Sequence, residues 1–148
     1  LWDIGCGSGS VAIEWMRAAR YARAIGIEPR GDRRAMAAAN ALALGAPRLD
    51  LVEGEAPMVL HGLERPDAIF VGGGMSEETF RTAWDMLRPL GRFVANAVTL
   101  ESEGLLNDLH SRHGGELTRI AVDRAEPLGA MRGWRSAMTV TQWSLVKR

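Results

Sequence analysis

The chain has 148 residues, of which 47% are hydrophobic, enough for one domain with a sizeable core. It carries 18 Lys and Arg against 18 Asp and Glu, so its formal net charge is zero. This balance gives no overall field that would attract nucleic acid or an anionic membrane, and we expect neither as a partner.

Targeting and membrane segments are not evident in the sequence. No apolar run approaches the roughly 18 residues that a membrane-spanning helix needs, and no signal peptide is present. The single cysteine excludes an internal disulfide and fits the reducing cytoplasm. The chain begins without Met and inside a strand pattern, so we expect residues 1–148 to be one domain, the C-terminal part of a longer two-domain enzyme.

Apolar runs alternate with helical patterns along the first half of the chain. The patterns predict, in order, a strand at 1–4, a helix at 11–20, a strand at 24–28, a helix at 31–44, and strands at 49–53 and 68–71. In the second helix Ala35, Met36 and Ala39 fall on one face, and Gly45 and Pro47 end it.

The third helix has the clearest signals. Ser76 can cap its N-terminus, and Glu77 and Glu78 suit its positive end. Its apolar residues follow the i, i+3, i+4, i+7 spacing of one helix face: Phe80, Ala83, Trp84 and Leu87. A strand at 92–97 and a helix at 101–113 follow.

The last part of the chain has a different rhythm. Strands are predicted at 117–123 and 137–146, with a loop and no helix between them. Two strands joined without a crossover helix are most simply antiparallel. The sequence therefore predicts an α/β fold with a mostly parallel seven-stranded sheet, an antiparallel last strand and helices on both faces.

A glycine-rich loop separates the first strand from the first helix. Gly5, Gly7 and Gly9 allow a tight turn and a close approach of a ligand to the main chain. Glu28 ends the second strand about 20 residues on, where a carboxylate can accept the hydroxyls of a ribose. The dinucleotide fingerprint requires a third glycine at position 10, which is Ser10. The loop and the acid together predict a different nucleoside-containing ligand.

The motifs "DIGCGSG", "IGIEP", "EGEAP" and "DAIFVGGG" resemble the class I S-adenosylmethionine-dependent methyltransferases over the whole chain. This resemblance implies a Rossmann-like fold and S-adenosyl-L-methionine as cofactor. In that family the glycine loop lies against the methionine part of the cofactor, the acid at Glu28 holds the ribose, and residues matching Glu55 and Ala56 border the adenine. The implied cofactor-binding residues are Asp3, Gly5, Cys6, Gly7, Ser8, Gly9, Glu28, Glu55, Ala56 and Gly72.

The stretch after the fourth strand bears on the methyl acceptor. Methyltransferases that act on exocyclic amines of bases usually carry a [DN]-P-P-[YF] motif there, whereas this chain has Gly72-Gly73-Gly74. The glycines leave an open floor beneath the methyl group of the cofactor and remove the groups that hold an amine. This favours a bulky acceptor or a carbon nucleophile, although the glycines are also compatible with a simple turn.

A closer resemblance joins these motifs to the tail "GAMRGWRSAMTVTQW". The set is similar to the C-terminal domain of the decarboxylating precorrin methyltransferases of cobalamin biosynthesis. The resemblance implies methylation of carbon 15 of a precorrin tetrapyrrole and decarboxylation of one acetate side chain. It also implies an N-terminal methyltransferase domain in the same polypeptide, and we expect a homo-oligomer.

The acceptor implied by this resemblance carries many carboxylates, which arginine binds in a bidentate way. Arg124, Arg132 and Arg135 lie in the predicted loop between the last two strands, where Met131 and Trp134 could cover the flat face of a macrocycle. We therefore predict these five residues to bind substrate. A solvated basic loop and a subunit interface are the alternatives.

No catalytic base or metal site stands out in the sequence. The three histidines lack ligand spacing with Cys or acidic residues, and Cys6 has no base partner, so we interpret it as a small packing residue. A class I methyltransferase acting on RNA or protein, and a non-catalytic cofactor-binding module, remain alternative functions.

Overall fold

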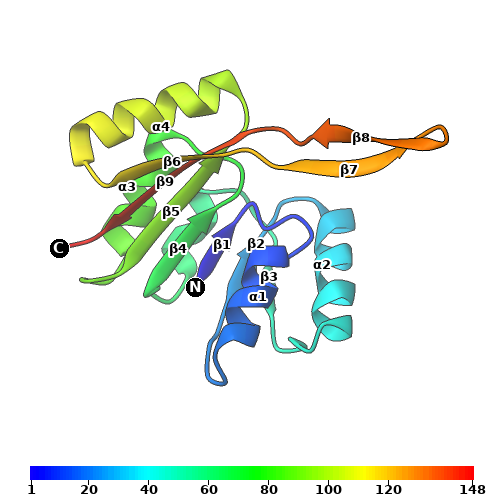
Figure 1. Cartoon of the computed structure of the whole chain (residues 1–148). Helices are drawn as coiled ribbons and strands as arrows, with labels where there is room; N and C mark the ends of the chain where they lie inside the picture. Colours follow the sequence, from blue (N-terminus) through cyan, green and yellow to red (C-terminus); the bar gives the residue numbers. More distant parts are fainter.

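In the computed structural model, which describes residues 1–148, seven strands form one sheet in the order β3–β2–β1–β4–β5–β9–β6 (Figure 1). The strands are β1 (Trp2–Ile4), β2 (Ile25–Ile27), β3 (Asp50–Val52), β4 (Ala68–Val71), β5 (Arg92–Ala97), β6 (Glu116–Ile120) and β9 (Val140–Val146). Strands β1 to β5 pair in parallel, and β9 lies antiparallel between β5 and β6. The predicted fold class is confirmed.

The helices follow the predicted order, each within a few residues of the expected bounds. They are α1 (Ser10–Ala18), α2 (Gly31–Ala43), α3 (Glu77–Met86) and α4 (Leu100–His113), with a short 3-10 helix η1 (Met58–Gly62) that the sequence did not predict. As expected, the Ser76 side chain accepts a hydrogen bond from the Thr79 N–H and caps α3. None of these helices is both long and apolar enough to cross a membrane.

The two faces of the sheet follow from strand register. Trp2 of β1 is aligned with Ile69 of β4, which is aligned with Phe93 of β5, so these three side chains share one face. Helices α3 and α4 cover that face. Asp3 points to the opposite face, where its carboxylate meets the N-terminus of α1. Figure 1 shows α1 and α2 over the β1–β3 side of the sheet.

An aromatic cluster forms the centre of the core on the α3–α4 face. The Phe80 ring lies 5.3 Å from the Phe93 ring and 5.2 Å from the Trp143 ring, measured between centroids. Trp143 is fully buried, and its Nε1 donates a hydrogen bond to the Gly114 carbonyl at 2.8 Å. This packing joins α3, β5 and β9, so the antiparallel strand is as deeply buried as its parallel neighbour.

The prediction of a loop between the last two strands is wrong. Strands β7 (Asp123–Leu128) and β8 (Met131–Ser136) form a separate two-stranded antiparallel ribbon, which projects from the sheet (Figure 1). Gly129, with φ 60°, sits at the first central position of a two-residue turn, as a type II′ hairpin requires. The ribbon escaped prediction because nearly all its residues are exposed, and it therefore lacks the apolar alternation of a half-buried strand.

Candidate cofactor-binding site

The glycine loop runs from the end of β1 to the start of α1 in a series of left-handed backbone conformations. Gly5, Gly7 and Gly9 have φ values of 68°, 54° and 80°. Such values disfavour a side chain, which explains three glycines at alternate positions. The N–H groups of Gly5 and Cys6 both donate to the Ile27 carbonyl, at 2.9 and 3.1 Å, and anchor the loop to β2.

The three glycines differ in what surrounds them. A Cβ on Gly5 would lie 2.8 Å from the Gly73 carbonyl oxygen, and one on Gly9 would lie 3.1 Å from the Cβ of Ala37 in α2. A Cβ on Gly7 would meet nothing within 4 Å. Gly5 and Gly9 therefore allow close packing within the protein, whereas Gly7 faces open space that a ligand can occupy.

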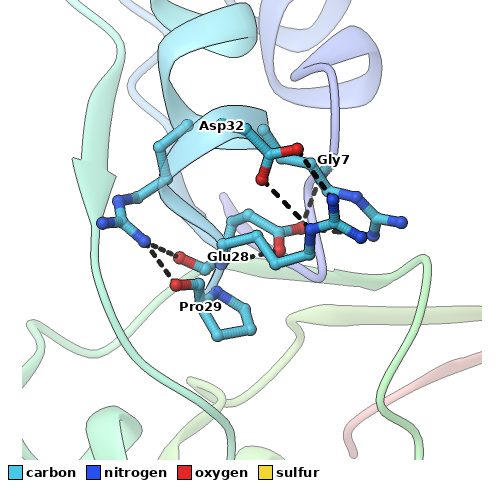
Figure 2. Close-up of polar contacts among 7 residues, drawn as sticks. Gly7, Glu28, Pro29 and Asp32 are labelled. Carbon is cyan, nitrogen blue, oxygen red and sulfur yellow. Dashed lines mark hydrogen bonds and ion pairs between the residues drawn. The ribbon is translucent and has the colours of Figure 1, made fainter.

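Glu28 follows the carboxyl end of β2, and its side chain contacts the Gly7 backbone. Its side chain is only 2% exposed. Its Oε2 accepts from the Gly7 N–H and its Oε1 from the Arg30 N–H, both at 3.1 Å, while Arg33 Nη1 lies 3.9 Å from Oε2 (Figure 2). A carboxylate has about four acceptor sites, so it retains sites for ligand hydroxyls. The structure thus brings together the loop and the acid, as the sequence predicted.

Arg34 is a residue of this region that the sequence analysis missed. Its guanidinium donates to the carbonyls of Glu28 and Pro29, at 2.8 and 2.7 Å (Figure 2). It also pairs with the carboxylate of Glu53 at 2.6 Å. It thereby ties the carboxyl end of β2 to that of β3. No local pattern marks it, because Glu53 lies 19 residues away in the sequence.

Asp3 and Cys6 are buried beside the loop. Asp3 is 1% exposed, and its Oδ2 accepts from the Ala12 N–H at 3.0 Å, which caps α1 in place of the glycine at the N-cap position. Burial raises the pKa of Asp3 to about 6. Burial, together with the charges of Asp3 and Glu28, raises the pKa of Cys6 to about 12. A neutral buried thiol agrees with a packing role for Cys6.

The other predicted cofactor residues border the same carboxyl edge of the sheet. The Ser8 carbonyl accepts from Asn40 Nδ2 at 3.0 Å, a contact with α2 that no motif indicated. The Gly72 N–H donates to the Ile4 carbonyl at 2.9 Å, and a Cβ on Gly72 would lie 3.4 Å from the Gly5 carbonyl oxygen. Glu55 is exposed after β3, and Ala56 packs against the main core.

The predicted substrate residues all lie on the ribbon, but its register divides them between two faces. Arg124 is aligned with Arg135, and Met131 shares their face. Arg132 and Trp134 point to the opposite face. Arg135 also pairs with Glu126 of the same ribbon, at 3.2 Å. The ribbon leaves the sheet between the end of β6 and the start of β9, which is the edge that holds the glycine loop.

Comparisons with known proteins identify the family. The model of the precorrin methyltransferase domain matches residues 1–147. A Sinorhizobium protein named precorrin-6Y C(5,15)-methyltransferase (decarboxylating) is 53% identical over 148 residues, which are 99% of this chain and 36% of that protein. A Mycobacterium tuberculosis protein of the same name is 44% identical over 149 residues, covering all of this chain and 38% of its own length.

A solved structure agrees with these sequences. The crystal structure of the C-terminal domain of precorrin-6Y C5,15-methyltransferase from Rhodobacter capsulatus has a TM-score of 0.89 and 51% identity, covering 99% of this chain and 79% of that one. The chain spans little more than a third of the length of these two curated relatives. The family model, the two relatives and the solved structure together show that the chain belongs to the precorrin methyltransferase domain family.

Proposed function

We propose that this chain transfers a methyl group from S-adenosyl-L-methionine to carbon 15 of a precorrin and removes carbon dioxide from an acetate side chain, in cobalamin biosynthesis. Membership of the precorrin methyltransferase domain family supports the acceptor, and the names of the relatives support both reactions. The observation that carries the cofactor assignment is the buried Glu28 carboxylate hydrogen-bonded to Gly7 at the open position of the glycine loop.

The residues present fit S-adenosyl-L-methionine. The backbone at Gly7 faces open space that a Cβ would enter, and the Glu28 carboxylate bound to the Gly7 N–H suits ribose hydroxyls. The loop residues Asp3 to Gly9 would hold the methionine part, and Glu28 would hold the ribose. Glu55 and Ala56 would border the adenine, and Gly72 would complete the wall of the site. When bound, the cofactor supplies a methyl group already activated on a sulfonium.

The chain's own contribution is to position the acceptor. Holding two reactants at near-attack distance is worth up to roughly 7–11 kcal/mol. The exposed Gly72-Gly73-Gly74 backbone leaves room for a large acceptor next to the glycine loop. A conjugated tetrapyrrole can supply carbanion character at a bridging carbon and can accept the electron pair released when its acetate loses carbon dioxide.

The ribbon supplies candidate substrate contacts. Arg124 and Arg135 lie side by side and can pair with substrate carboxylates, and Met131 lies on the same face nearer the turn. Arg132 and Trp134 would serve a ligand on the other face. The exposed apolar side chains Met131 and Trp134, 77% and 79% exposed, equally support the expectation of a homo-oligomer assembled through this ribbon.

The domain organisation is part of the proposal. The chain matches 36% and 38% of the length of its curated relatives, whose names include methylation at two positions, 5 and 15. We propose that residues 1–148 form the domain that acts at carbon 15 and that an N-terminal methyltransferase domain of the same polypeptide acts elsewhere on the tetrapyrrole.

The substitution Glu28→Gln tests the cofactor site. An amide in place of the carboxylate presents an N–H to the donors of the ribose and of Gly7, so we expect the affinity for S-adenosylhomocysteine to fall at least about tenfold in a calorimetric titration. Glu14→Gln on the exposed face of α1 is the control and should bind normally. Unchanged affinity in the Glu28 variant would contradict the site.

Turnover separates the proposed activity from its alternatives. We expect incubation with methyl-labelled cofactor and a precorrin substrate to yield a tetrapyrrole that has gained the label and lost carbon dioxide, as measured by mass spectrometry. A non-catalytic binding module would bind the cofactor and transfer nothing. An RNA methyltransferase would label structured RNA, with binding that weakens steeply as salt is added.

A further inference from the structure

Within residues 1–148, no helix lies over one half of the sheet face beside the glycine loop, the half formed by β4, β5 and β9. Helix α1 packs against β1, whereas α4 packs against β5 and β9 from the opposite face. On the uncovered half, Phe70 of β4 and Val94 of β5 are half-buried, although their strand neighbours on the other face are fully buried. Figure 1 shows α1 and α2 over the β1–β3 part alone.

Two amide side chains stand at the carboxyl edge of this uncovered face. Asn96 is aligned with Gln142 across the β5–β9 pair, and both are half-buried. Gln142 Nε2 donates to Asn96 Oδ1 at 2.9 Å, and neither amide has another hydrogen-bonding partner within the chain. The contact orients the Asn96 amide, whose two Nδ2 hydrogens stay available to a ligand.

Strand register places this pair in line with the cofactor site. Ile4 is aligned with Val71, and Val71 with Ala95. One residue further along each strand, Gly5, Gly72 and Asn96 therefore form a row across the carboxyl edge. Adjacent strands are about 4.8 Å apart, so Asn96 lies one strand beyond Gly72 and roughly 10 Å from Gly5. Ligands of parallel sheets bind at this edge.

The chemistry of the pair matches the acceptor rather than the cofactor. The cofactor side of the row presents a carboxylate at Glu28, which suits hydroxyls, whereas the Asn96 amide presents two N–H donors, which suit a carboxylate. Cross-strand polar pairs also occur simply as part of a sheet. Here, however, the donors at Asn96 remain unused at the edge where the acceptor must approach.

We propose that Asn96 binds a carboxylate of the tetrapyrrole acceptor and that Gln142 is a positioning residue that orients the Asn96 amide. This inference rests on the proposed function and deepens it, because it extends the acceptor subsite from Gly72 across β5 to β9. The Asn96 amide belongs to the sheet itself, so its position depends neither on the ribbon nor on the assembly of a homo-oligomer through the ribbon.

The test compares Asn96→Asp with Ser144→Ala in the whole chain. Asn96→Asp keeps the size of the side chain and the acceptor for Gln142 but replaces the donor by a negative charge, so folding should be preserved. The control residue is Ser144, which lies on the same strand and face as Gln142 but two residues further from the carboxyl edge, where it is aligned with Val94. The measurements are the KM for the precorrin substrate, its dissociation constant with saturating S-adenosylhomocysteine, and the dissociation constant of S-adenosylhomocysteine alone.

We expect the KM and dissociation constant for the tetrapyrrole to rise more than about tenfold in Asn96→Asp, because a donor is lost and a like charge is added. Gln142→Ala should raise the KM less, and Ser144→Ala should not change it. The affinity for S-adenosylhomocysteine should stay unchanged in all three variants. This pattern supports the inference.

Two outcomes overturn the inference. In the first, Asn96→Asp binds the tetrapyrrole as well as the unsubstituted chain does. In the second, Asn96→Asp loses thermal stability and loses affinity for the cofactor by the same factor as for the tetrapyrrole, which would mean that the Asn96–Gln142 pair has a structural role only. Both leave the proposed function intact. That function fails separately, if the unsubstituted chain binds no tetrapyrrole or if Glu28→Gln leaves cofactor affinity unchanged.

Discussion

Asp3 shows how a single buried carboxyl serves local structure. Helix α1 starts after Gly9, which has no side chain to cap it. Asp3 accepts from the Ala12 N–H instead, across nine residues, and so joins the end of β1 to the first turn of α1. The arrangement buries an ionisable group, which raises the pKa of Asp3 from 3.8 to about 6.

This raised pKa predicts a pH-dependent stability. Between about pH 4 and 6 the folded chain binds more protons at Asp3 than the unfolded chain does, so Asp3 lowers the free energy of unfolding as the pH rises through that range. The full effect is about 3 kcal/mol. The substitution Asp3→Asn keeps the cap acceptor and removes the titrating group, so stability at pH 7 relative to pH 4 should improve by up to this amount in urea titrations.

A control variant tests the origin of this effect. Asp32 is an exposed carboxyl whose pKa is lowered by its hydrogen bond and ion pair with Arg30. A carboxyl with a lowered pKa contributes a free energy of unfolding that rises with pH, opposite in sign to the contribution of Asp3. The variant Asp32→Asn should therefore shift the pH trend in the direction opposite to that of Asp3→Asn. An Asp3→Asn variant with the same pH profile as the unsubstituted chain would show that Asp3 is not the group responsible.

At the scale of the element, the glycine loop combines two functions that can be separated. Gly5 lets the loop approach the Gly73 backbone, whereas Gly7 leaves space open at the residue whose N–H binds Glu28. Both have left-handed φ values, 68° and 54°, so both incur the same backbone penalty when a side chain is added. Their different surroundings predict different consequences for stability and for binding.

The substitutions Gly5→Ala and Gly7→Ala form a matched pair. Each should lose about 1–2 kcal/mol of unfolding free energy from the backbone conformation alone. Gly5→Ala should lose more, because its Cβ would lie 2.8 Å from the Gly73 carbonyl oxygen and backbone must move. Gly7→Ala should weaken binding of S-adenosylhomocysteine more strongly than its stability loss suggests. Urea denaturation without ligand and calorimetric titration measure the two effects, and equal stability losses would contradict the packing argument.

At the scale of the whole molecule, the chain is divided into a closely packed sheet and an exposed ribbon. Trp143 on β9 is fully buried against Phe80 and Phe93, whereas Trp134 on β8 is 79% exposed. The five tryptophans of the chain therefore do not contribute equally to the free energy of unfolding. The position of the strand in the molecule decides the role of the same side chain.

The variants Trp143→Ala and Trp134→Ala measure this division. We expect Trp143→Ala to lose about 3–5 kcal/mol of unfolding free energy, from the cavity and from the lost hydrogen bond to Gly114. Trp134→Ala should change the free energy of unfolding of the monomer by less than about 0.5 kcal/mol. Denaturation at low protein concentration isolates the monomer, and a large loss there for Trp134→Ala would mean that the ribbon packs against the chain's own core.

Much of the architecture could be predicted because it is encoded locally. Alternating and helical periodicities mark the seven sheet strands and four helices, and turn residues separate them. The glycines at 5, 7 and 9 and the acid at 28 stand out because their spacing follows from a strand–loop–helix–strand unit. The ribbon was missed because its two strands bury neither face, and such strands have no alternation of apolar and polar residues in the sequence.

The sequence by itself determined the order of the sheet strands and helices, the glycine loop and the acid that follows β2, because each depends on nearby residues. Only the tertiary structure decided that Glu28 hydrogen-bonds to Gly7, 21 residues away, that the ribbon arginines divide between two faces, and that Asn96 meets Gln142, 46 residues away. These contacts depend on strand order and register, which are set by packing the whole sheet and are therefore absent from any short stretch of the chain.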